Sequence, residues 1–134
     1  MNAERLLEGE LTGRIIKCFY RVYDALGFGF LESVYQNAML YELAAEGLVA
    51  VAEQALDVRY KDRIIGHFRV DLLVEGRVII EIKASEVLPP AGRKKLLNYL
   101  RGSTVEVGLL LHFGPKPKFE RVVFTNDHKG HRTQ

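Results

Sequence analysis

Three charged side chains on two neighbouring apolar runs are the residues of this sequence best placed to do chemistry. Asp71 lies in the first run, Glu81 and Lys83 lie in the second, and residues 75–77 (Glu-Gly-Arg) separate the two runs. This spacing suits a hairpin with a three-residue loop and a glycine where φ is positive. Residue 74 then pairs with residue 78, and Asp71 lies opposite Glu81. Because side chains alternate along a strand, all three charges project from one face.

The opposite face of the predicted hairpin is apolar throughout. It is formed by Phe68, Val70, Leu72, Val74, Val78, Ile80 and Ile82. A two-residue loop would turn Asp71 and Glu81 to opposite faces and bury one carboxylate in the core. The three-residue loop is therefore favoured.

Two carboxylates that face each other across a hairpin repel. Cross-strand Cβ atoms lie roughly 5 Å apart, and two charges at that distance repel by about 3 kcal/mol at an effective dielectric constant of about 20. Lys83 offsets part of this repulsion, and a divalent cation held by both acids would offset more. Mg²⁺ suits such a site, because it takes few protein oxygens, keeps several waters and accepts phosphate. The alternative interpretation is a solvated polar face on an antiparallel sheet.

The composition indicates one ordinary globular domain. The chain has 134 residues, 48% apolar and 27% charged, enough for a single core. We expect the domain over residues 1–125 and a flexible tail over residues 126–134. The net charge of +2 means that any nucleic-acid surface must come from local clusters of basic residues. With a single cysteine, Cys18, and no apolar run near the roughly 20 residues needed to span a bilayer, we expect a cytoplasmic protein without membrane contact.

The predicted elements follow the order α-α-β-β-β-α-β-β. The predicted helices cover residues 4–26, 31–46 and 91–101, and the predicted strands cover residues 49–60, 64–74, 78–84, 107–113 and 119–124. The run 107–113 is almost entirely apolar, which is typical of a strand buried on both faces. A helix that crosses from the hairpin to this strand predicts an α/β protein with a mixed sheet and helices on both of its faces.

This arrangement of charges and elements resembles the PD-(D/E)XK nuclease superfamily. Its pattern is an acid on a helix, Asp on one strand, Glu-x-Lys on the next strand and then a crossover helix. Residues 29–35 (Gly-Phe-Leu-Glu-Ser-Val-Tyr) resemble the signature of the bacterial GxxExxY proteins in that superfamily, and residues 68–74, 80–84, 96–101 and 107–110 are also similar to it. The resemblance implies a restriction-endonuclease-like αβββαβ core with an extra N-terminal helix.

The resemblance also implies a role for each member of the site. Asp71, Glu81 and Glu32 would hold Mg²⁺ or Mn²⁺. Lys83 would position or activate the attacking water, so that these four residues are the implied catalytic set. The implied activity is metal-dependent cleavage of DNA, or alternatively RNA. Without the resemblance, Glu32 is interpreted as a first-turn acid favoured by the helix dipole.

Four further residues are expected to bind the substrate: Tyr35, Arg69, Lys95 and Tyr99. Tyr35 lies three residues after Glu32 on the same helix face, and its hydroxyl is expected to be hydrogen-bonded near the site. Arg69 shares the predicted face of Asp71. Lys95 departs from the family pattern, because relatives usually have Gln there. Its charge would either pair with the acids in competition with a metal or bind a phosphate.

Basic residues form two small groups that could follow a phosphate backbone, with a solvated surface as the alternative. They are Arg93, Lys94, Lys95 and Arg101 on the third predicted helix and Lys116, Lys118 and Arg121 around the last turn. His67 is expected either to line the substrate channel or to be hydrogen-bonded structurally, whereas His128 and His131 lie in the polar tail. The alternative function is a non-catalytic nucleic-acid-binding or oligomeric interaction domain, the latter through the long apolar first helix and the aromatic loop of Phe28 and Phe30. A homodimer would allow so small a domain to cut both strands of a duplex.

Overall fold

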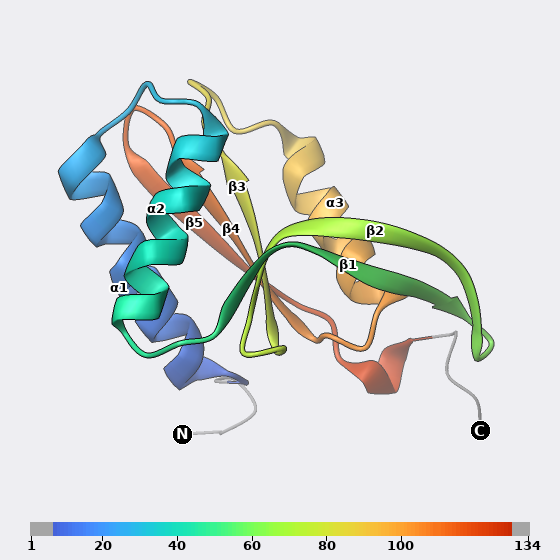
Figure 1. Ribbon diagram of the computed structural model, residues 1–134. Coiled ribbons are helices and arrows are strands. Elements are labelled where there is room, and N and C mark those ends of the chain that lie inside the picture. The colour runs from blue at the N-terminus through green and yellow to red at the C-terminus, as the bar shows by residue number, and fades with distance from the viewer. Residues whose placement is uncertain (1–6, 130–134) are drawn as a thin grey trace.

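A five-stranded sheet runs through the middle of the protein, with two helices on one face and one helix on the other (Figure 1). The computed structural model describes residues 7–129. The strands are β1 (Ala50–Tyr60), β2 (Arg63–Val74), β3 (Val78–Lys83), β4 (Val107–Phe113) and β5 (Pro117–Val123), in that spatial order. β3 and β4 are parallel, and all other neighbours are antiparallel. The predicted mixed α/β architecture is confirmed.

Three α-helices cover the sheet: α1 (Gly9–Leu26), α2 (Glu32–Ala45) and α3 (Pro90–Gly102). α1 begins later than predicted, and residues 4–6 of the predicted range lie outside the described part of the chain. α3 begins with Pro90, at a position where the missing N–H would have no helical partner in any case. Within residues 7–129, no helix is both long and apolar enough to cross a membrane.

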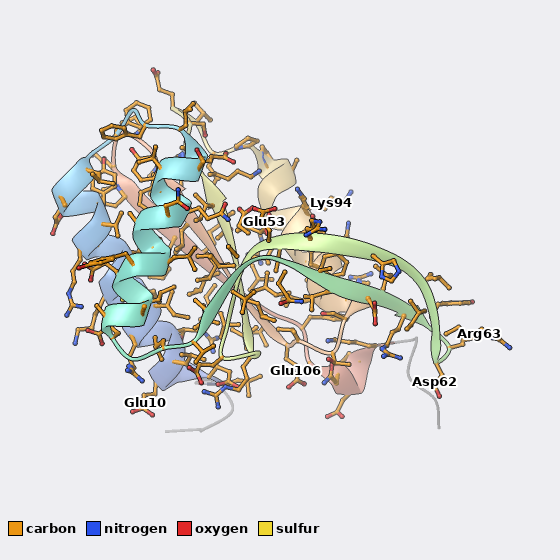
Figure 2. All side chains as sticks on the ribbon, viewed as in Figure 1. Glu10, Glu53, Asp62, Arg63, Lys94 and Glu106 are labelled. Atoms are coloured by element: carbon orange, nitrogen blue, oxygen red, sulfur yellow. The ribbon has the colours of Figure 1, made fainter. Side chains whose placement is uncertain are left out.

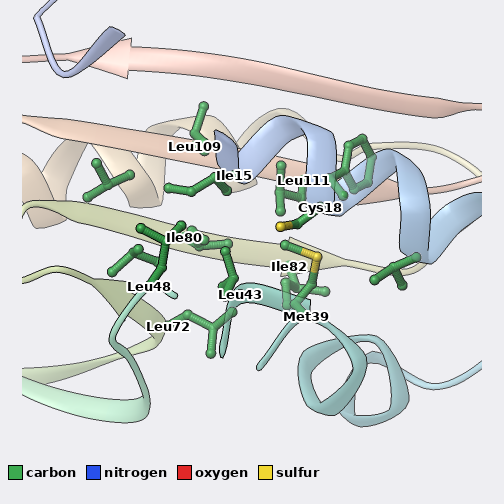
Figure 3. Close-up of a cluster of buried hydrophobic side chains, with 14 of the residues drawn as sticks. Ile15, Cys18, Met39, Leu43, Leu48, Leu72, Ile80, Ile82, Leu109 and Leu111 are labelled. Atoms are coloured by element: carbon green, nitrogen blue, oxygen red, sulfur yellow. The ribbon is translucent and has the colours of Figure 1, made fainter. Parts of the chain in front are cut away.

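The larger hydrophobic core lies between the sheet and the pair α1 and α2 (Figure 3). Ile15 and Cys18 of α1 and Met39 of α2 are fully buried there against Ile80 and Ile82 of β3. A second and smaller cluster lies between the other face and α3. The β3–β4 pair separates the two clusters, which explains why β4 is apolar on both faces.

β2 contributes to both clusters and changes sides at Asp71. Leu72 packs with α1 and α2, whereas Phe68 and Val70 pack on the side of α3. The prediction that Phe68 and Val70 share the face of Leu72 is therefore wrong. Glu53 of β1 lies opposite Asp71 and has a φ of 53°, in the left-handed region that residues with a Cβ rarely adopt. Beyond this point β1 and β2 run over α3 as a two-stranded arm, residues 54–70 (Figure 1).

The β2–β3 hairpin has the predicted register, because Val74 pairs with Val78. Glu75 and Gly76 have φ values of 54° and 65°, and the N–H of Arg77 donates to the carbonyl of Val74 over 2.9 Å. Two consecutive positive φ values are typical of a type I′ turn. The loop that fixes the register of Asp71, Glu81 and Lys83 is therefore stabilised by contacts between residues that are neighbours in sequence.

The chain after β5 is held against the end of α3. Residues Asn126–His128 form a 3₁₀ helix, η2, and the next residue, Lys129, is buried. Its ammonium donates to the carbonyls of Ser103 and Val105 over 2.9 and 2.8 Å. The first residues of the expected flexible tail thus pack on the domain, His128 is exposed, and His131 lies outside the described residues.

Candidate active site

Asp71 and Glu81 face each other, and each accepts a hydrogen bond from the backbone of the other strand. The N–H of Asp71 donates to Oε2 of Glu81 over 3.0 Å, and the N–H of Ile82 donates to Oδ2 of Asp71 over 2.7 Å. The regular hairpin pairing runs from 74–78 to 72–80, so these bonds continue the ladder through side chains. Each carboxylate is thereby fixed through one of its two oxygens.

Glu81 is a buried acid with a strongly shifted pKa. Glu81 is only 3% exposed to solvent. Burial, followed by the charge of Asp71, raises the pKa of Glu81 to about 7, although the N–H of Asp71 and the charges of Lys95 and Lys83 act in the opposite direction. Near neutral pH, ionisation of both Asp71 and Glu81 is therefore unfavourable unless a cation binds between them.

Asp71 is surrounded by more acids than the sequence analysis considered. Burial raises the pKa of Asp71, the hydrogen bond from Ile82 lowers it, and the charges of Glu32 and Glu53 raise it further. Glu53 lies on β1 and was missed, because nothing in its local sequence links it to a site 18 residues later in the chain. Its positive φ is a tertiary feature that residue types do not reveal.

Lys83 is the last residue of β3, and its side chain lies against the first turn of α3. A Cβ at Gly92 would lie 3.7 Å from Cε of Lys83, so the glycine keeps space beside the lysine stem. The charge of Lys83 lowers the pKa values of Asp71 and Glu81. Gly92 is a further site residue that sequence reasoning did not assign.

Glu32 is the first residue of α2 and reaches the end of β3. The N–H of Ala84 donates to its Oε2 over 3.4 Å, which is a long hydrogen bond. The side chain is exposed, and its charge acts on Asp71. Glu32 therefore belongs to the edge of the acidic group rather than to its buried pair.

Tyr35 positions the loop before α2. Its ring is fully buried and stacks on Phe113 with centroids 4.1 Å apart. Its hydroxyl donates to the carbonyl of Gly27 and accepts from the N–H of Phe30 over 3.2 Å. These contacts show Tyr35 holding the loop, and its expected contact with a substrate stays a prediction. The loop presents Phe28 and Phe30, which are 42% and 48% exposed.

Lys95 is an exposed residue of α3 whose charge interacts with the two acids. Contact with the Tyr99 side chain is the largest cause that raises the pKa of Lys95, and the charges of Glu81 and Asp71 raise it further. Its Nζ lies 5.6 Å from the centroid of the Tyr99 ring. This exposed lysine thus adds a positive charge beside the buried carboxylates, where a neutral glutamine would add none.

Tyr99 and Arg69 lie on different elements, Tyr99 on α3 and Arg69 on β2. The Tyr99 ring is half-buried and stacks on Phe68 at 4.2 Å with an interplanar angle of 6°. Arg69 is exposed and donates from Nη1 to the carbonyl of Glu53 over 2.9 Å. His67, on the arm, bonds to Asp57 through Nδ1 at 2.9 Å, which favours the structural interpretation of that histidine.

The two predicted basic groups have different surroundings. Arg93 pairs with Glu120 at 3.3 Å, and the Arg121 guanidinium donates to the carbonyl of Leu7. Lys94 of α3 is exposed (Figure 2), and Arg101 of the same helix is also exposed. Only part of the predicted phosphate-binding surface is thus engaged with other protein groups.

The sequence profile of the PD-(D/E)XK nuclease superfamily matches residues 9–122. The chain belongs to this superfamily. The narrower GxxExxY assignment is not part of that match. Enzymes of the PD-(D/E)XK nuclease superfamily generally use divalent metals and act on nucleic acids.

A solved structure supports the same fold. The crystal structure of SSO0001 is similar to this chain with a TM-score of 0.51 and 18% sequence identity, over 69% of this chain and 50% of that chain. At this identity the likeness shows the fold alone, and this PD-(D/E)XK domain spans only half of the length of SSO0001. No curated protein matches the chain.

The donor atoms of this PD-(D/E)XK site fit a hard divalent cation held by two carboxylates. In residues 7–129 there is no group of three or more His, Cys, Asp or Glu side chains that could hold a metal ion. Asp71 and Glu81 alone offer two oxygens, and Mg²⁺-type cations commonly take one or two carboxylates and complete their shell with waters and phosphate. The resemblance implies that Glu32 is a metal ligand. Within residues 7–129, however, Glu32 does not form a preformed three-acid cluster with Asp71 and Glu81.

Proposed function

We propose that this protein hydrolyses phosphodiester bonds of nucleic acids with the help of a divalent cation. The observation that supports this is the buried Asp71–Glu81 pair, whose repulsion a cation would relieve, with Lys83 beside it. A cation bound there supplies charge relief to the phosphate and makes a water more acidic. The proposal uses only groups that the fold already brings together.

The residues of the chain have distinct tasks in this hydrolysis. Glu81 is held by the backbone N–H of Asp71, and Asp71 is held by the backbone N–H of Ile82, so the two carboxylates offer a fixed anionic cradle. The Lys83 ammonium donates a hydrogen bond to the attacking water and stabilises the negative charge that develops on the phosphate. The water gives up a proton to solvent and its oxygen forms the new bond to phosphorus as the bond to the leaving oxygen breaks. A proton from solvent then neutralises the leaving group.

Three narrower statements belong to the same proposal. We assign the cation as Mg²⁺, with Mn²⁺ as a substitute, because the donors are carboxylate oxygens. We assign the chain to the GxxExxY group, because Gly29 has a φ of 123°, Glu32 reaches β3 and Tyr35 holds the intervening loop. The substrate is proposed to be DNA, cut by a homodimer where both strands are cleaved.

A second function, nucleic-acid binding without cleavage, is favoured by one observation. Lys95 places a positive charge beside Glu81 and Asp71, where it competes with a cation for the acids. A domain of this kind would bind oligonucleotides in a salt-dependent way and would not need Lys83.

The test is cleavage of labelled single- and double-stranded DNA and RNA with Mg²⁺ or Mn²⁺, and with EDTA as the metal-free arm. Lys83→Met is the decisive variant, because it keeps the stem beside Gly92 and removes the charge. Lys17→Met changes an exposed lysine of α1 in the same way and is the matched control. We expect cleavage by the native protein and the control, and a loss of at least about 100-fold in Lys83→Met.

Cleavage that persists in Lys83→Met, or cleavage in EDTA, would contradict the proposed mechanism. Absence of cleavage in every arm, together with oligonucleotide binding that Lys83→Met leaves unchanged, would establish the binding function instead. Replacing Lys95 by Gln separates the two cases further. If its charge competes with the cation, Lys95→Gln binds Mg²⁺ more tightly in a calorimetric titration.

A further inference from the structure

A groove of about 510 Å³ lies between the arm and the C-terminal half of α3, apart from the acidic site. Val58, Tyr60 and Ile65 of the arm form its apolar wall. Tyr60 and Ile65 are 53% and 63% exposed. Sites of roughly 300–1,000 Å³ hold small organic ligands, so the groove is large enough for one nucleotide.

The polar groups of this groove are all suited to an anion. Arg59 and Lys61 border it from the arm, and Arg101 borders it from α3. None of the described residues that line the groove is acidic. The cavity at the start of α1 differs, because its lining mixes acids with arginines: Glu8, Glu10, Glu75, Arg14 and Arg77. An apolar wall beside three cations matches a base joined to phosphates.

The groove and the acidic site both border α3. α3 contains no Asp or Glu, and its basic residues include Lys94, Lys95 and Arg101. Lys95 lies beside the carboxylates, and Arg101 lies at the groove. At a rise of about 1.5 Å per residue these two positions are about 9 Å apart along the helix. A nucleic-acid strand in a duplex advances by about 3.4 Å per nucleotide, so the separation corresponds to about three nucleotides.

The walls of the groove are fixed by packing. Phe68 of the arm stacks on Tyr99 of α3, and a Cβ at Gly102 would lie 3.1 Å from Cγ1 of Val58. The Arg101 guanidinium lies 5.0 Å from the centroid of the Phe124 ring. The arm is thus attached to α3 on the site side of the groove, while its tip at residues 61–63 projects beyond the helix (Figure 2).

We propose that this groove binds a nucleotide of the substrate strand about three nucleotides from the scissile phosphate. The base lies against Tyr60 and Ile65, and the flanking phosphates bind Arg59 and Arg101. The proposal rests on the proposed function, because it takes a nucleic-acid strand as the ligand. It goes beyond that function by assigning a second contact that sets where the strand lies relative to the acids.

The first test measures binding separately from cleavage. In the Lys83→Met background and EDTA, the anisotropy of short fluorescent single-stranded DNA gives the dissociation constant at several salt concentrations. We expect the double variant Arg59→Gln/Arg101→Gln to weaken binding at least about ten-fold and to reduce the salt slope by about 1.4, since each lost phosphate contact contributes about 0.7 for a single strand. The double variant Lys17→Gln/Arg77→Gln removes the same charge on other surfaces and should leave the slope unchanged.

A second variant tests the base contact without a change of charge. Tyr60 is exposed on the arm, so Tyr60→Ala is expected to fold, which circular dichroism verifies. We expect it to weaken binding about ten-fold, as for the loss of one stacked base. A photoreactive base placed three nucleotides from the labelled cleavage position is expected to crosslink to the peptide that contains Tyr60.

Unchanged affinity and salt slope in both groove variants, with no crosslink at Tyr60, would overturn the proposal even if the protein cleaves DNA. Loss of binding in these variants in a protein that never cleaves would uphold the groove and refute the nuclease function. A change of sedimentation from dimer to monomer in the groove variants, with DNA affinity retained, would show that a second copy occupies the groove and would also overturn the proposal. RNA of the same sequence shows whether the groove discriminates the sugar.

Discussion

Replacing Glu81 by Gln should stabilise the metal-free protein, although it removes a central residue of the site. The pKa of Glu81 is about 7 in the folded protein against an ordinary value of 4.5. Between these values the folded state binds more protons than the unfolded state, so this group makes stability fall as the pH rises. The difference of about 2.5 pKa units corresponds to about 3 kcal/mol. The amide of Gln has no charge to lose, and its oxygen can still accept the hydrogen bond from the N–H of Asp71.

The assay is urea denaturation in EDTA from pH 5 to pH 8. We expect Glu81→Gln to exceed the native protein in free energy of unfolding by less than about 1 kcal/mol at pH 5 and by about 3 kcal/mol at pH 8. For a domain of this size, the latter corresponds to a melting temperature higher by about 10 °C. Asp24→Asn, at an exposed acid of α1, is the control, and its difference from the native protein should not vary in this way.

Added Mg²⁺ supplies the complementary measurement. We expect millimolar Mg²⁺ to raise the stability of the native protein at pH 8 and to leave Glu81→Gln nearly unchanged, because ligand binding to the folded state alone is stabilising. A Glu81→Gln protein that is no more stable than the native one at pH 8 in EDTA would refute the reasoning. It would mean that Lys83 and Lys95 already compensate the buried pair of charges.

Two other substitutions test the elements that position the site. Tyr35→Phe removes the hydroxyl that bridges Gly27 and Phe30. It should cost about 1 kcal/mol and speed hydrogen exchange of the Phe30 amide; unchanged protection of that amide would contradict the assigned role. Gly108→Ala would place a Cβ 2.6 Å from Cδ1 of Leu96 and force α3 away from β4. We expect a loss of about 1–3 kcal/mol in chemical denaturation, and a variant within about 0.5 kcal/mol of the native protein would show that the helix can shift without strain.

The part of the site that is local in sequence was predictable. Alternating side chains and the Glu-Gly-Arg loop define the hairpin register, so the pairing of Val74 with Val78 and the approach of Asp71 to Glu81 followed from short-range geometry. The order of elements also predicted the mixed sheet, because a helix between two strands requires a crossover.

The parts that depend on tertiary packing were not predictable. β2 looks like one continuous alternating strand, but its twist at Asp71 sends Phe68 and Val70 to the side of α3. The positive φ of Glu53 accompanies the same distortion. For Tyr35, sequence spacing gives the helix face and not the depth of burial. Such features arise from contacts between distant segments, and residue types alone do not encode them locally.

Because β2 changes sides at Asp71, this one strand links the two hydrophobic clusters on opposite faces of the sheet. A strand that packs into one cluster before Asp71 and into the other after it cannot leave either cluster without disturbing both. Asp71 and Glu81 lie at this crossing and join β2 to β3 through their side chains. A cation bound between them would therefore strengthen the cooperativity of the whole domain, so that local opening of the arm and global unfolding would approach each other in free energy. Cation binding at the site would then change the hydrogen-exchange protection of amides far from it, in α1 as well as in α3.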